Sequence, residues 1–258
     1  MKITHSAGLL AGLALLAGAA VRLATAEQPS EPPLADQRLS VHTLLREDVF
    51  AGILEKDMDR LARGEKNIET LLAQRPKDKA PLLVWKGGVV LYRAVLALEA
   101  GRHKEFEEKY KSAVELLAEG KKLGPKDFGV TAATAGIYSI FADRLPEKLR
   151  GPAWATAYDS YQLLWKNQER FAQTLSLHLK GELLGGLAES AQRTGHQKEL
   201  DEYLDKILKV APNSAYAKVA RQWKDDPTAA TRTRITCLSC HAAGRLEARQ
   251  AALRKEKE

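Results

Sequence analysis

Apolar residues recur every three or four positions along most of this chain. Between Leu34 and Trp223, segments rich in Ala and Leu carry this helical period, and Gly and Pro separate each segment from the next. The alternating pattern that is typical of strands is nearly absent. The hydrophobic pattern therefore predicts an all-α fold made of amphipathic helices.

The positions of Gly and Pro group these helices into pairs. The expected helical hairpins cover residues 45–76, 82–122, 127–171 and 181–212. Residues 144–152 contain two prolines, which predicts a loop between the two helices of the third hairpin. Because one hairpin cannot bury its apolar face alone, stacked hairpins should share a core. The aromatic residues expected to pack between the helices are Trp85, Tyr92, Trp154, Tyr158, Tyr161, Trp165 and Trp223.

The fourth hairpin carries small and apolar residues at the intervals of a known repeat. These residues are Leu184, Leu187, Ala188, Ala191, Gly195, Leu200, Leu204, Ile207 and Pro212. The segment resembles the tetratricopeptide repeat, in which small residues let two helices approach, a Gly ends the first helix and a Pro ends the second. The resemblance implies a tetratricopeptide-like array, an α-solenoid, over residues 45–224. Such arrays commonly bind peptides or proteins.

The first residues have the pattern of a secretory signal. Lys2 supplies a positive start, an apolar run follows, and Ala24-Thr25-Ala26 forms a cleavage site. We expect cleavage after Ala26, an N-terminal extension over residues 27–44, and a periplasmic protein. Cleavage lowers the formal net charge from +7 to +5, which predicts no nucleic-acid partner. No second apolar stretch of membrane length is expected, and therefore no stable membrane insertion.

The only two cysteines of the chain lie close to its end. Cys237-Leu-Ser-Cys240-His241 has the spacing that covalent attachment of a c-type haem requires. Each thiol can add to one vinyl group of the porphyrin, and His241 can bind the iron as an axial ligand. The sequence therefore predicts one haem c in a C-terminal segment, residues 225–258, made of a linker, the motif and a basic helix near 245–255.

Other uses of this cysteine pair need features that the sequence lacks. A structural zinc site needs four ligands, whereas the remaining histidines are scattered singly. A redox dithiol of the thioredoxin type belongs in a strand-rich setting, and a disulfide across two residues would be strained. The small cytochrome c fold is excluded because its motif lies near the N-terminus and a Met ligand follows far downstream. The layout is analogous to that of the cytochromes c′, whose motif lies in the last helix.

The sixth ligand of the iron is open at this stage. The candidates are His42, Met58, His103, His178 and His196, or no residue at all. A strong sixth ligand would give an electron carrier, and an empty position would admit small ligands. Arg234 and Arg245 are candidates for contacts with the haem propionates.

The leading hypothesis is a periplasmic mono-haem c-type cytochrome that transfers single electrons. The helical repeats would dock a redox partner protein or peptide. One haem with no evident acid or base cluster argues against a multielectron enzyme, so we expect an electron carrier and not an enzyme. One alternative is a tetratricopeptide scaffold with a redox thiol pair, acting in cytochrome maturation or envelope assembly. A third hypothesis is a five-coordinate haem sensor or peroxidase.

Overall fold

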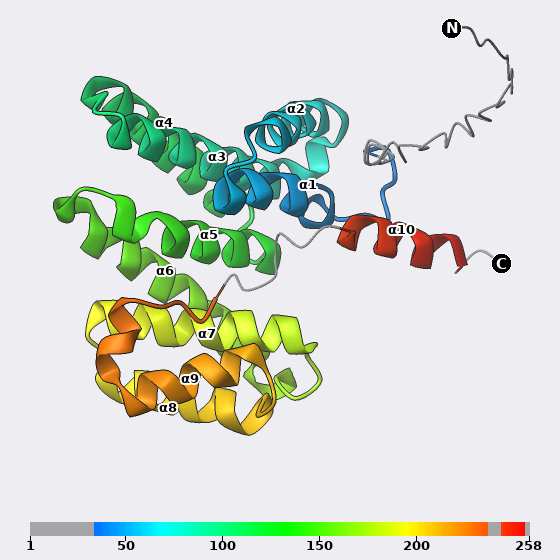
Figure 1. The fold of residues 1–258 in the computed structure, drawn as a ribbon. Coiled ribbons are helices and arrows are strands. Elements are labelled where there is room, and N and C mark those ends of the chain that lie inside the picture. The colour runs from blue at the N-terminus through cyan, green and yellow to red at the C-terminus, as the bar shows by residue number, and fades with distance from the viewer. Residues whose placement is uncertain (1–33, 237–243, 256–258) are drawn as a thin grey trace, which may run out of the picture. The chain divides into compact units, whose positions relative to one another are not determined.

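Helices form the regular structure of the described residues (Figure 1). A computed structural model describes residues 34–236 and 244–255, and no strand occurs among them. The α-helices are α1 (Val41–Phe50), α2 (Met58–Gln74), α3 (Lys79–Glu99), α4 (His103–Leu123), α5 (Phe128–Phe141), α6 (Glu147–Gln168), α7 (Leu177–Thr194), α8 (Gln197–Val210), α9 (Ala215–Asp225) and α10 (Arg245–Lys255). The expectation of an all-α fold is confirmed for these residues.

Helix ends follow local chemistry that the sequence displays. The side chains of Ser40, Asp57 and Ser214 each accept a hydrogen bond from a backbone N–H in the first turn of α1, α2 and α9. Gly195 ends α7 with φ +78°, the left-handed conformation that glycine adopts without strain. This is the role that the repeat pattern predicts for Gly195.

Consecutive helices pack as antiparallel neighbours. The pairs α1 and α2, α3 and α4, α5 and α6, and α7 and α8 each make an extensive contact, and α9 packs on α8. The helix positions match the expected hairpins, although α1 begins at Val41, before the expected boundary at residue 45.

The expected loop over residues 144–152 is wrong. α6 begins at Glu147, and Pro152 lies inside it. A proline there removes one backbone hydrogen bond of the helix. The packing that follows offsets this loss, because Trp154 is 4% exposed and its Nε1 donates to Asp143 Oδ1 at 2.7 Å. Burial of an aromatic side chain outweighs the local preference here.

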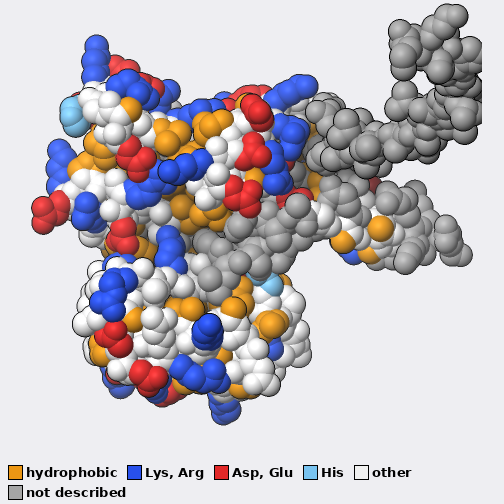
Figure 2. Space-filling view, in the orientation of Figure 1, with side chains coloured by type: hydrophobic (Ala, Val, Ile, Leu, Met, Phe, Trp, Pro, Cys, Tyr) orange, Lys and Arg blue, Asp and Glu red, His pale blue; other side chains and the backbone are white. Residues whose placement is uncertain are grey.

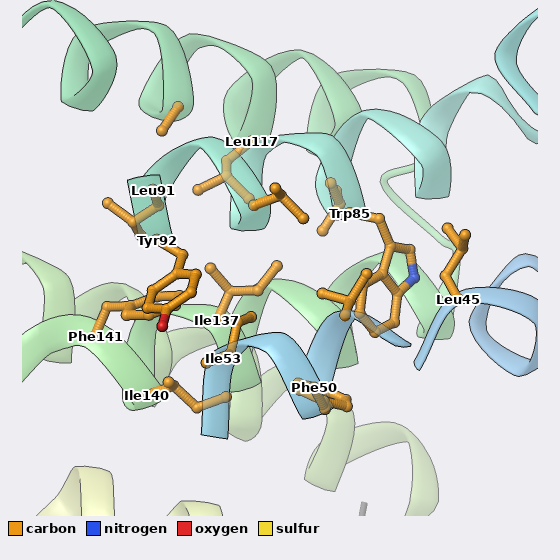
Figure 3. Packing of buried hydrophobic residues seen from close by; sticks show 14 of the residues in the cluster. Leu45, Phe50, Ile53, Trp85, Leu91, Tyr92, Leu117, Ile137, Ile140 and Phe141 are labelled. Carbon is orange, nitrogen blue, oxygen red and sulfur yellow. The ribbon is translucent and has the colours of Figure 1, made fainter. Parts of the chain in front are cut away.

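The buried side chains form two clusters. The first lies among α1 to α6 and includes α10; Figure 3 shows its centre, where Tyr92 stacks on Phe141 at 5.7 Å. The second lies among α5 to α9 and includes Ala229, Ala230 and Ile235. Of the aromatics expected to pack, five are buried, namely Trp85, Tyr92, Trp154, Tyr161 and Trp223, and Tyr158 and Trp165 are partly buried.

One described helix, Pro76–Glu99, is long and apolar enough to cross a membrane by length and composition. This corrects the expectation that no second stretch reaches that length. Of its most apolar window, 67% is buried inside the protein, against α4 and α5.

Charged side chains of both signs are interspersed over the face shown in Figure 2. Several form ion pairs between helices, such as Arg93 with Glu65 at 2.8 Å and Arg144 with Glu99 at 2.8 Å. Exposed pairs of this kind contribute about 0–1 kcal/mol each.

Candidate functional site

Cys237, Cys240 and His241 lie outside the described residues, but the chain on either side of them is described. Residues up to Thr236 precede the motif, and residues from Gly244 follow it. The contacts of these two flanks can therefore be described, although the motif itself cannot.

The flank before the motif is held by Glu189 of α7. This side chain is 3% exposed, and its Oε1 accepts hydrogen bonds from Ile235 N at 2.5 Å and Thr236 N at 2.8 Å. Its Oε2 accepts from Thr236 Oγ1 at 2.9 Å and from Arg234 Nη2 at 3.0 Å. Arg234, a candidate for a propionate contact, thus forms an ion pair with Glu189.

The same flank packs closely on the backbone of α7. A Cβ added at Gly185 would lie 2.8 Å from Ile235 Cγ2. Upstream, Pro227–Thr231 forms a 3-10 helix in which Ala229 and Ala230 are buried. Residues 227–236 are therefore packed on the helical array, which differs from the open linker that their composition suggests.

The flank after the motif is held by α1. Leu246 N donates to Glu47 Oε1 at 2.7 Å, and the side chains of Leu246 and Leu253 are buried in the first cluster. α10 thus packs on the N-terminal helices, while the other flank packs on α7. The side chain of Arg245, the second propionate candidate, is not described.

A cavity of about 550 Å³ lies among helices that hold these flanks. α1 and α7 both contribute to its wall, together with α3, α5 and α6. Most of the lining is apolar: Phe50, Trp85, Phe128, Ala132, Ala133, Ile137, Ile140, Leu164, Phe171, Leu175, Leu179 and Leu183. Phe128, Phe171 and Leu179 are about half exposed, so apolar surface meets solvent at this cavity.

Small residues form the part of the wall that α5 provides. Gly129, Ala132, Ala133 and Gly136 share one face of the helix, at spacings of three and four residues. A Cβ added at Gly136 would meet no atom within 4 Å, so open space lies beside the backbone there. The missing side chains leave room for a flat group against α5.

His42 of α1 lines the cavity, with its ring 5.5 Å from the Trp85 ring. Its pKa is lowered from 6.5 to about 4, first because the surrounding protein atoms disfavour the charged ring, and further by the charges of Arg46 and His178. The imidazole is therefore neutral at neutral pH. A neutral imidazole is the form that binds metals.

His178 of α7 lines the same cavity and belongs to a hydrogen-bonded chain. Tyr216 Oη donates to Glu182 Oε1 at 2.9 Å, and lies 3.3 Å from His178 Nδ1. With its proton donated to Glu182, the Tyr216 hydroxyl oxygen can accept from His178 Nδ1–H. This arrangement leaves the lone pair of the ring on Nε2, the nitrogen of a metal-binding tautomer.

The other candidate ligands do not line the cavity. The His196 ring stacks on Tyr158 at 4.4 Å, and its Nδ1 is 2.7 Å from Thr194 Oγ1. Met58 and His103 are exposed first residues of α2 and α4. The structure thus brings together two of the five candidates, His42 and His178.

Sequence patterns did not indicate that Tyr216 and Glu182 would be hydrogen-bonded beside His178, or that Glu189 would bind the chain before the motif. A signal for part of this was present: His178, Glu182, Gly185 and Glu189 recur at three- and four-residue spacing and so share one face of α7. Among the described side chains, no group of three or more His, Cys, Asp and Glu is arranged to hold a metal ion.

The lowered pKa of His42 gives a test by pH. The pKa of His42 is 6.5 in the unfolded chain and about 4 in the folded protein, so the folded state disfavours protonation between these pH values. The contribution of His42 to stability is therefore complete above pH 6.5 and is lost as the pH falls towards 4. We expect an NMR titration to place the His42 pKa near 4, and Arg46→Gln to raise it. A pKa at or above 6.5 would contradict this environment.

No family model, curated protein or solved structure matches this chain. The cavity with its described side chains, together with the sequence motif, therefore carries the functional proposal.

Proposed function

We infer that this chain is a periplasmic mono-haem c-type cytochrome that transfers single electrons. Cys237 and Cys240 attach the haem, His241 binds its iron, and the porphyrin occupies the cavity beside α5. The observation that carries this proposal is the position of the motif's flanks: both are fixed to helices, α7 and α1, that line one apolar cavity with two imidazoles in it.

Chain length supports this arrangement. Cys237 directly follows Thr236, and consecutive Cα atoms are about 3.8 Å apart. Cys240 is four residues from Thr236, so even extended chain places it within about 14 Å. Thr236 and Ile235 pack at Gly185 of α7, two helical turns from His178 on the same helix face. Haem attached at these cysteines is therefore within reach of the cavity.

The cavity also suits the chemistry of a porphyrin. Its volume falls in the range of cofactor pockets, about 300–1,000 Å³. The apolar lining matches the ring faces, the small residues of α5 leave space for a flat group, and the half-exposed edge at Phe128 and Phe171 allows propionates to reach water. The cavity therefore suits a haem in its shape, in its polarity and in the imidazole nitrogens that it offers to the iron.

In this proposal the protein supplies binding, orientation and insulation. When bound, the haem supplies a one-electron redox centre. The apolar wall excludes water from the ring faces, which disfavours the more highly charged state of the iron. The helical hairpins, which we propose form a tetratricopeptide-like array, would dock a redox partner so that its own centre comes close to the haem edge.

The test is expression of the full chain with its signal sequence and a cytochrome c maturation system. We expect haem staining of the polypeptide after denaturing electrophoresis, and an optical spectrum that changes on reduction. The variant Cys237→Ser/Cys240→Ser should lose the stain, whereas Ser239→Ala, between the same two cysteines, should retain it. A correctly processed wild-type protein without covalent haem would overturn the proposal and favour a scaffold with a thiol pair.

A further inference from the structure

The cavity contains two imidazoles, and only one can complete the coordination of an iron that already has a histidine ligand. Resting on the proposed function, we propose that His178 binds the iron on the face opposite the motif histidine, and that Tyr216 and Glu182 position it. The iron would then have two histidine ligands, a strong-field set that gives a low-spin centre and leaves no position for small ligands.

The first support for this proposal is the hydrogen bonding of His178. A metal-binding histidine almost always donates its second ring N–H to a carboxylate, a carbonyl or a water. Here His178 Nδ1 is 3.3 Å from Tyr216 Oη, which in turn donates to Glu182 Oε1 at 2.9 Å. The carboxylate acts through the tyrosine hydroxyl, which can accept from Nδ1–H and so favours the tautomer with its lone pair on Nε2.

The orientation of Tyr216 is itself rigid. Its ring packs on the backbone of α7 at Gly181, where an added Cβ would lie 2.3 Å from Tyr216 Cε2. Tyr216 is 5% exposed in the second cluster. The hydroxyl is therefore held in place by packing, and not by the hydrogen bonds alone. A side chain held in this way can keep the imidazole of His178 in one orientation.

The second support is the position of His178 along α7. His178, Gly185 and Glu189 lie on one face of the helix, and the chain that leads to Cys237 is fixed over Gly185 and Glu189. A haem attached through Cys237 would therefore lie over the face that carries His178. His42 belongs to α1 and has no such relation to the first attachment residue.

The contrast with His42 makes the assignment testable. The His42 ring packs against the tilted Trp85 ring at 5.5 Å, and among the described residues no carboxylate hydrogen-bonds its imidazole. His42 also lines the cavity, so it is a matched control: the same residue type at the same cavity, but without a positioning partner.

The experiment compares optical and electron paramagnetic resonance spectra of the purified holoprotein and its variants. We expect a low-spin wild type, a high-spin His178→Ala variant whose haem still stains on a denaturing gel, and restoration of the low-spin spectrum by added imidazole. His42→Ala should stay low-spin. His178→Met, which keeps a ligand and the cavity volume, should give a low-spin centre with a raised reduction potential.

Tyr216→Phe tests the positioning role. It keeps the ring that packs on Gly181 but removes the hydroxyl, so His178 should be displaced by added imidazole about 10- to 100-fold more easily. Glu182→Gln should act in the same direction. A purely structural role for Tyr216 would leave this competition unchanged.

The outcomes separate this inference from the proposed function. Absence of covalent haem in the wild type would overturn both. Covalent haem together with a low-spin His178→Ala variant would overturn the His178 assignment alone, and loss of low spin in His42→Ala would assign the ligand to His42. A high-spin wild type would overturn it as well and favour a ligand-binding haem.

Discussion

Replacing Glu189 by alanine should lower the free energy of unfolding by about 3–5 kcal/mol. The backbone N–H groups of Ile235 and Thr236 are buried, and both donate to Glu189 Oε1. Without that oxygen they have lost their acceptor, at a cost of about 1–3 kcal/mol each, and Arg234 loses its carboxylate partner. Urea unfolding of the holoprotein measures the change.

Glu99→Ala is the matched control for this prediction. Glu99 also forms an ion pair with an arginine, Arg144, but its side chain is 48% exposed. Its loss should change the free energy of unfolding by no more than about 1 kcal/mol. Equal effects of the two variants would contradict the role of Glu189 as an anchor. Because Glu189 holds the chain before Cys237, Glu189→Ala should also broaden the optical spectrum of the proposed haem, whereas Glu99→Ala should not.

The second large effect is expected for Gly186→Val, at about 3 kcal/mol of destabilisation. The Tyr161 ring lies directly on the α7 backbone at Gly186, and an added Cβ would be 2.1 Å from Tyr161 Cζ. Helix propensity alone would favour valine over glycine by less than about 1 kcal/mol, so the clash decides the sign. Tyr161 also lines the cavity, so a displaced ring would occupy space in which we propose that the haem binds.

Gly136→Ala provides the comparison, because the same propensity acts there without a clash. No atom lies within 4 Å of a Cβ at Gly136. In the protein without haem, such as the Cys237→Ser/Cys240→Ser variant, we expect Gly136→Ala to be as stable as its parent or more stable by about 0.5–1 kcal/mol. Thermal unfolding of both variants checks the pair of predictions. A stable Gly186→Val protein would show that the Tyr161 ring can move aside.

Much of the fold could be predicted because helical periodicity and glycine positions are local signals. The apolar period of α3 and the Gly195 stop of α7 are examples, and both agree with the structure. The expectation of a loop at Pro152 failed because a local signal was outweighed by tertiary packing. Proline disfavours a helix locally, but the burial of Trp154 and its hydrogen bond to Asp143 stabilise the helix.

The candidate site could be predicted only in part, since its residues are far apart in the sequence. The motif itself is a short pattern, so Cys237, Cys240 and His241 were apparent, and their role stays a prediction. The cavity joins His42 of α1 to His178 of α7, and no sequence spacing links these two residues. Of the five candidate ligands, only His42 and His178 line the cavity, and this depends on tertiary packing that the sequence does not display.

The contact between Leu246 N and Glu47 joins residues that are 199 positions apart. Neighbouring helical hairpins form through short loops, whereas a contact of such high sequence separation closes slowly because the chain entropy must be lost first. The C-terminal helix should therefore dock last during folding. Until then the C-terminal segment is held through residues 227–236 alone, by Glu189 of α7 and by the buried Ala229 and Ala230. If haem is attached as we propose, its attachment can therefore precede the docking of α10, the final step of folding.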